Sequence, residues 1–178
     1  MSLPWGYGLL FSFGGTFISA AGMTENEGWC FTLIGLGGLA ANPVAGILCD
    51  RRDARRLFGV HGLLMGMGVA LFAVAASSLP ALVVSGLCIG YVGYAGAMVC
   101  AQAMIARQVA EGRQATALAL QQNAIDVGIA SASALYGAVF SVFGAAAAEP
   151  FVCQACLIAL VGLLLAKRWA SPARWPAC

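Results

Sequence analysis

Residues 46–59 read GILCDRRDARRLFG, and this short stretch decides the fold. The chain of 178 residues carries only nine Lys or Arg and seven Asp or Glu, and six of these charged side chains lie between Asp50 and Arg56. Residues 28–49 before this cluster and 57–106 after it contain no charged side chain. The stretch is therefore interpreted as a polar link between two membrane-spanning helices.

The composition supports the same interpretation for the whole chain. It is 61% hydrophobic and only 9% charged, whereas soluble domains carry roughly 25% charged residues. These values indicate an all-α, polytopic membrane protein whose first partner is the lipid bilayer. The net charge of +2, without a basic patch interleaved with aromatics, gives no indication of a nucleic-acid partner.

Apolar runs without charge predict where the chain crosses the membrane. A spanning helix needs about 20 apolar residues to cross about 30 Å of hydrocarbon. The segment SSLP at 77–80 divides the longest run, and the run after Arg113 is too short for two helices, so it is one long helix. The sequence predicts a single bundle over residues 1–178 with six transmembrane helices at about 3–22, 28–49, 58–77, 80–105, 114–142 and 150–167. Trp5 and Tyr7 are expected near a membrane interface, and the pair Asn42-Pro43 predicts a kink.

The distribution of charge predicts the orientation. All nine basic residues fall in the links 50–56 and 106–113 or in the tail after 166, which six helices place on one side of the membrane. The links on the opposite side contain only acidic charges. By the positive-inside rule the basic side is cytoplasmic, so the prediction is a multi-pass protein of the cell (inner) membrane with both termini in the cytoplasm.

The charged link resembles a known signature. Gly46, Leu48, Asp50 and Arg51 match the pattern G-x-L-x-D-R-x-G-R-R of the major facilitator superfamily, and Arg55 and Arg56 match with an offset of one residue. The glycine of the motif is absent, with Asp53-Ala54 in its place. The resemblance implies a bundle of two inverted three-helix repeats and a cytoplasmic gate motif formed by Gly46, Asp50, Arg51 and Arg55. The alternative is that the arginines act only as topology signals and lipid anchors.

A second stretch extends the resemblance. Residues 107–144 resemble the eleventh helix region of drug- and sugar-efflux-type members, with Asn123, Gly128 and Gly137 in an N-x-G-x-x-x-G-type run. The chain is thus similar to the C-terminal six-helix half of such a transporter. This resemblance implies a second six-helix bundle as partner, either a missing N-terminal half or a second copy of the chain.

Asp126 is the candidate for a proton or substrate path. It is the only charged residue deep inside a predicted span, about 20 Å from Arg113 at about 1.5 Å rise per residue and thus near the midplane. Gln122 and Asn123 precede it by one helical turn and are expected on the same face. Intramembrane acids commonly line such paths. The alternative is a structural acid satisfied by Gln122, Ser133 or a neighbouring helix.

The fourth predicted span offers a cavity-lining stripe. Tyr91, Tyr94, Met98 and Gln102 lie on one helical face, and an aromatic and polar stripe inside a membrane suits an amphipathic organic substrate. The alternative is that the two tyrosines only fill space between helices. The sequence indicates no cofactor and no metal site, because His61 is its single histidine.

The function expected from these features is secondary active transport, by this chain or by half of a transporter. The resemblance implies efflux of a small organic solute by alternating access, with the proton as candidate coupling ion. The alternative is a non-transporting or degenerate membrane subunit that assembles with a partner bundle. An enzyme is not expected, since neither G-x-S-x-G nor H-E-x-x-H occurs.

Overall fold

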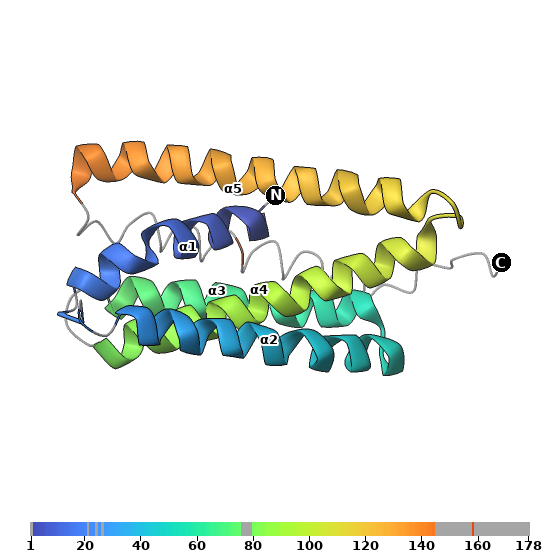
Figure 1. Cartoon of the computed structure of the whole chain (residues 1–178), viewed down its shortest axis with the longest axis horizontal. Coiled ribbons are helices and arrows are strands. Elements are labelled where there is room, and N and C mark those ends of the chain that lie inside the picture. Colours follow the sequence, from blue (N-terminus) through green and yellow to red (C-terminus); the bar gives the residue numbers. More distant parts are fainter. Residues whose placement is uncertain are drawn as a thin grey trace.

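The computed structural model describes residues 2–20, 22–23, 25, 27–75, 80–144 and 158. Within these residues the chain folds into α-helices joined by short links and contains no strand. The helices are α1 (Ser2–Ala20), α2 (Glu27–Arg51), α3 (Ala54–Ala75), α4 (Pro80–Gln108) and α5 (Gln114–Phe143). They run side by side along the long axis of the molecule (Figure 1). The predicted all-α class is confirmed.

The helix boundaries follow the predicted spans closely. α4 begins at Pro80, a residue whose fixed φ suits the first helical position. α5 is continuous over 30 residues with Asp126 inside it, as expected for the fifth run. α2 continues through Pro43 to Arg51. The sixth predicted helix, 150–167, lies outside the described residues except for Ile158, which is buried.

Length and hydropathy identify membrane spans directly in part of the chain. In the described ranges, three helices are long and apolar enough to cross a bilayer, over Glu27–Arg51, Ala81–Gln108 and Gln114–Val142. The count of six spans stays a prediction.

The link between α2 and α3 is unusually short, because only Arg52 and Asp53 separate the two helices. The backbone N–H of Arg55 donates to Oδ1 of Asp53 at 3.0 Å, and the N–H of Leu57 donates to the Asp53 carbonyl oxygen at 3.2 Å. Asp53 is therefore the N-cap of α3, a position where aspartate is strongly preferred. This role gives a physical reason for aspartate in place of the motif glycine.

Glycines bring α3 and α4 together, and this pair makes the most extensive helix contact among the described elements. A Cβ atom on Gly93 would collide with the Met65 backbone and lie 2.8 Å from the carbonyl oxygen of His61. A Cβ atom on Gly68 would likewise meet the backbone of Gly90. Small residues thus let the two backbones touch.

The described helices form two groups, which Figure 1 shows on opposite sides of the bundle. α2 and α3 both pack on α4, whereas α1 packs mainly on α5 and less extensively on α4 and α3. Two aromatic pairs join α1 to α5, Trp5–Tyr136 and Phe13–Phe140. Ser12 and Ser133 add a hydrogen bond of 2.7 Å between their hydroxyls. Since the Ser133 hydroxyl donates to the Ile129 carbonyl at 2.9 Å, Ser12 is the donor between the two serines.

The links 52–53 and 109–113 lie at the same end of the bundle (Figure 1). We call this end the arginine-rich end, because it carries Arg51, Arg52, Arg55, Arg56, Arg107 and Arg113. The placement of these two basic links on one side agrees with the alternation expected from the helix count.

Candidate functional site

A large open cavity lies between the two helix groups. Its volume is about 620 Å³, and its walls come from α1, α2, α4 and α5. The lining residues are Tyr7, Asn42, Tyr91, Tyr94, Ala95, Met98, Val99, Gln102, Gln122, Ile125, Asp126 and Ile129. Polar groups are thus concentrated inside an otherwise apolar bundle.

The predicted stripe on α4 faces this cavity. Tyr91, Tyr94, Met98 and Gln102 all line it. Their spacing along one helix keeps them on one face, and α3 packs on α4 elsewhere through Gly90 and its neighbours. The structure therefore brings the whole predicted stripe to one surface.

Asp126 enters the cavity from α5 together with Gln122. The side-chain Nε2 of Gln122 donates to Oδ1 of Asp126 at 3.0 Å, one helical turn away. All three side chains are exposed, but only Gln122 and Asp126 line the cavity, and Asn123 does not. Ser133 bonds instead to Ile129 and Ser12. The structure thus brings together two of the three residues expected for the proton or substrate path.

Tyr7 is a cavity residue that the sequence analysis missed. Its ring stacks on Tyr94 with a centroid distance of 4.0 Å and an interplanar angle of 10°. Tyr94 is the central residue of α4, so the expectation that Tyr7 lies near a membrane interface is wrong. The reason is that α1 begins level with the middle of α4 (Figure 1). Asn42 was also missed, although an amide within an apolar span was a usable signal.

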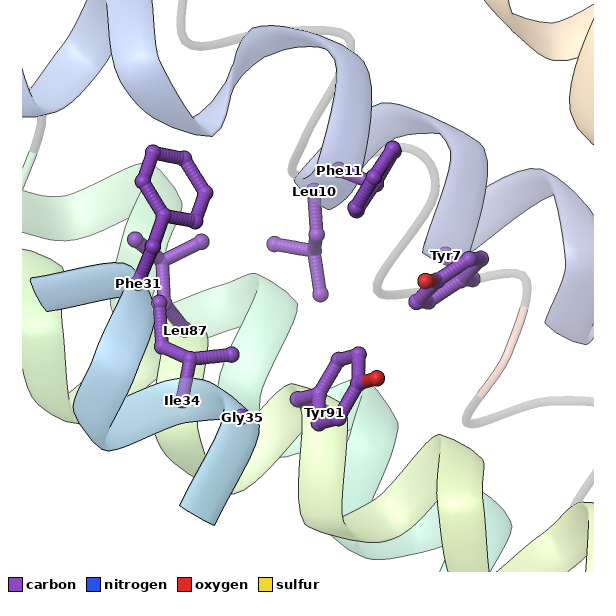
Figure 2. A pocket seen from close by; sticks show the side chains of 8 residues that line it. All are labelled: Tyr7, Leu10, Phe11, Phe31, Ile34, Gly35, Leu87 and Tyr91. Carbon is purple, nitrogen blue, oxygen red and sulfur yellow. The ribbon is translucent and has the colours of Figure 1, made fainter. Parts of the chain in front are cut away.

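A second, smaller cavity adjoins the first. It has a volume of about 230 Å³ and lies between α1, α2 and α4. Figure 2 shows its lining residues, Tyr7, Leu10, Phe11, Phe31, Ile34, Gly35, Leu87 and Tyr91. Apart from two tyrosine hydroxyls, these side chains are apolar. Tyr7 and Tyr91 line both cavities and so form the boundary between them.

At the arginine-rich end, Arg107 of α4 holds the end of α2. Its guanidinium donates to the Cys49 carbonyl oxygen at 2.8 Å and lies 3.8 Å from Oδ1 of Asp50. A cation at a helix C-terminus also interacts favourably with the helix dipole. The side chain of the same Cys49 contacts α4 as well, because the buried Sγ atoms of Cys49 and Cys100 are 3.2 Å apart. Two contacts of different kinds therefore join the ends of α2 and α4.

The sequence of the chain was compared with sequence models of known protein families. Residues 2–175 match the sequence model of the Major Facilitator Superfamily. The chain belongs to the Major Facilitator Superfamily. Comparisons with curated proteins and with solved structures gave no significant match. Superfamily members are transporters and not enzymes, so membership supports a transport function in general, with a multi-pass chain in a lipid bilayer and a small-molecule substrate.

The superfamily motif covers the end of α2, the link and the start of α3. Asp50 lies in the last turn of α2 and contacts Arg107, which the sequence analysis had treated only as a topology signal. Arg51 is exposed, and the backbone of Arg55 bonds to the α3 cap. A Cβ atom on Gly46 would meet no atom within 4 Å. Gly46, the first residue of the motif in this major facilitator chain, is therefore not required for a close approach within the described bundle.

Proposed function

We propose that this chain supplies one side of the substrate path of a secondary active transporter, which exports a small organic solute by alternating access. The observation that carries the proposal is the cavity itself. A chain of the superfamily presents aromatic rings, amides and one carboxyl group around a space of about 620 Å³ between its helices. Such a mixture of apolar walls and few polar groups is typical of binding sites for organic molecules.

Asp126 is proposed as the group that carries the coupling proton. Ionised, its carboxylate accepts the hydrogen bond from Gln122 that the structure contains. Protonated, the carboxyl group can donate to the amide oxygen of the same Gln122, because an amide offers both donors and an acceptor. Both protonation states thus have a partner, which suits a group that must gain and lose a proton during each cycle. Asn123 is retained as a polar neighbour outside the cavity lining.

The contact of Arg107 with Asp50 and Cys49 is proposed as part of a cytoplasmic gate, together with Gly46, Arg51 and Arg55. This assignment takes the arginine-rich end as cytoplasmic by the positive-inside rule, with both termini on that side of the inner membrane. A surface ion pair has a small net strength, about 0–1 kcal/mol. Such a pair is well suited to break and re-form when bundles rock against each other.

A partner bundle is proposed to cover the open side of the cavity. Alternating access in this superfamily needs two bundles around a central site, and the described helices leave the cavity between them partly open. The partner is a separate six-helix bundle or a second copy of this chain. The six spans of this chain, as two inverted three-helix repeats, form part of the same proposal.

Reconstitution into proteoliposomes tests the transport function. The purified chain, alone and with its partner bundle, is challenged with neutral, cationic and anionic organic solutes while a trapped pH dye reports proton movement. We expect that transport of at least one of these solutes is accompanied by proton movement, which the pH dye reports. Asp126→Asn should abolish the proton movement but leave measurable solute exchange, whereas Glu111→Gln, in the exposed link after α4, should change neither. Absence of any solute movement in all combinations would instead support the non-transporting subunit.

A further inference from the structure

We propose that the substrate is an amphipathic organic cation, with its charged head beside Asp126 and its apolar group in the smaller cavity. This inference rests on the proposed transport function and names the substrate class of the same site. It follows from three properties of the two cavities: the sign of the charge, the kind of wall, and their connection through Tyr7 and Tyr91.

The charge in the larger cavity has one sign. Asp126 is the single carboxylic acid among its described lining residues, and none of them is Lys, Arg or His. Eight of the nine basic residues of the chain lie in sequence outside the predicted spans, and the ninth, Lys167, is the last residue of the span at 150–167. Since opposite charges attract and like charges repel, a cation is favoured beside Asp126 and an anion is repelled.

The residues beside this carboxylate also favour a positively charged ligand. Tyr7, Tyr91 and Tyr94 line the cavity, and an organic cation near an aromatic face is attracted by the negative face of the ring. Tyr7 and Tyr94 form a parallel stack, whereas Tyr91 is tilted by 44° to Tyr7 at a centroid distance of 5.7 Å. Met98 adds a polarisable side chain to the wall.

The smaller cavity supplies the place for the apolar group. Its aliphatic and aromatic side chains come from α1, α2 and α4, and it has no charged lining residue in the described part of the chain. Figure 2 shows Tyr7 and Tyr91 beside each other at one end of this cavity. Because both tyrosines also line the larger cavity, one molecule can place its head and its apolar group on opposite sides of them.

Three probes distinguish the contribution of the charged head to binding from that of the apolar tail. They are 4-phenylbutyltrimethylammonium, tetramethylammonium as the head alone, and 4-phenylbutyrate as an anion whose tail is one methylene shorter. Saturable binding is measured to the full chain, with its partner bundle where one is required, in phosphatidylcholine nanodiscs. We expect the phenylbutyl cation to bind at least about tenfold more tightly than tetramethylammonium. The phenylbutyrate anion should show no saturable binding, and equal binding of cation and anion would overturn the proposal.

Two pairs of variants test which cavity holds the head of the probe and which holds its tail. Asp126→Asn should weaken both cations about tenfold, and Glu111→Gln should weaken neither. Gly35 lines the smaller cavity and has free space beside it, since a Cβ atom there meets nothing within 4 Å. Gly35→Leu should therefore remove the advantage of the phenylbutyl tail and leave tetramethylammonium unaffected. Gly28→Leu, a matched change on the same helix with equally free space, should alter neither affinity.

The outcomes distinguish this inference from the transport proposal. Binding of the phenylbutyl cation without transport of any solute would contradict transport and leave the site assignment standing. Proton-coupled transport of phenylbutyrate, without binding of either cation, would contradict the site assignment and leave transport standing. The probe comparison on the unmodified chain decides the matter even if a variant fails to fold.

Discussion

Arg107 illustrates how one side chain can matter for conformation more than for stability. It is 53% exposed and its partner Asp50 is 83% exposed, so water screens their attraction and the pair contributes about 0–1 kcal/mol. The hydrogen bond to the Cys49 carbonyl gives the guanidinium a second, fixed acceptor. A contact of this strength can hold one arrangement of α2 and α4 without preventing its release.

Replacing Arg107 tests this role. Arg107→Gln should change the free energy of unfolding by no more than about 1 kcal/mol, yet alter the transport rate several-fold because the ends of α2 and α4 separate more easily. Arg107→Lys should restore part of the rate, since it keeps the charge but not the planar donor geometry. Arg113→Gln in the neighbouring link is the control. Identical rates for the Arg107→Gln and Arg113→Gln variants would contradict a gating contact.

The residues of the site differ in how far the sequence alone could predict them. The stripe from Tyr91 to Gln102 could be predicted because positions on one helix have a fixed angular relation. The bond from Gln122 to Asp126 is likewise set by a spacing of one turn. Tyr7 and Asn42 could not be placed, because the register between different helices depends on side-chain packing and follows no sequence period.

Among the helices, α3 and α4 depend most on the absence of side chains. Gly93→Leu should destabilise the bundle by at least about 1–3 kcal/mol, the usual cost of forcing extra atoms into a packed interior, because backbone atoms of α3 occupy the space. Thermal unfolding in detergent measures the effect. Gly35→Leu, a similar change with free space around it, should leave the melting temperature near that of the unmodified chain. Equal melting temperatures for both variants would contradict the close approach of the two helices.

The helices themselves were predicted well from the sequence. Charge-free runs marked five helices to within a few residues, and the break at Pro80 and the single long α5 were both anticipated. Bilayer thickness and the cost of charge in hydrocarbon explain this success. The sequence did not indicate which helices pair, because apolar helices of similar composition offer many alternative contacts.

At the scale of the whole molecule, the open side of the cavity leads to a prediction about assembly. If a second copy of the chain covers it, the transport rate per chain should fall as proteoliposomes are diluted towards one chain per vesicle. Two copies joined in tandem by a flexible linker should keep their rate on dilution, because the linker raises the effective concentration of each partner. A rate per chain that stays constant on dilution of the unlinked chain would exclude a second copy as the covering bundle.

The division of the described helices into α1 with α5, and α2 and α3 with α4, has a mechanical consequence. The cavity lies along the boundary between these two groups, and Tyr7 crosses it to stack on Tyr94. Packed helices commonly slide by small shear movements that preserve their side-chain interdigitation. We therefore expect shear along this boundary to widen or narrow the cavity while each group stays intact. One bundle could then adapt its width to solutes of different girth before any rocking against a partner begins.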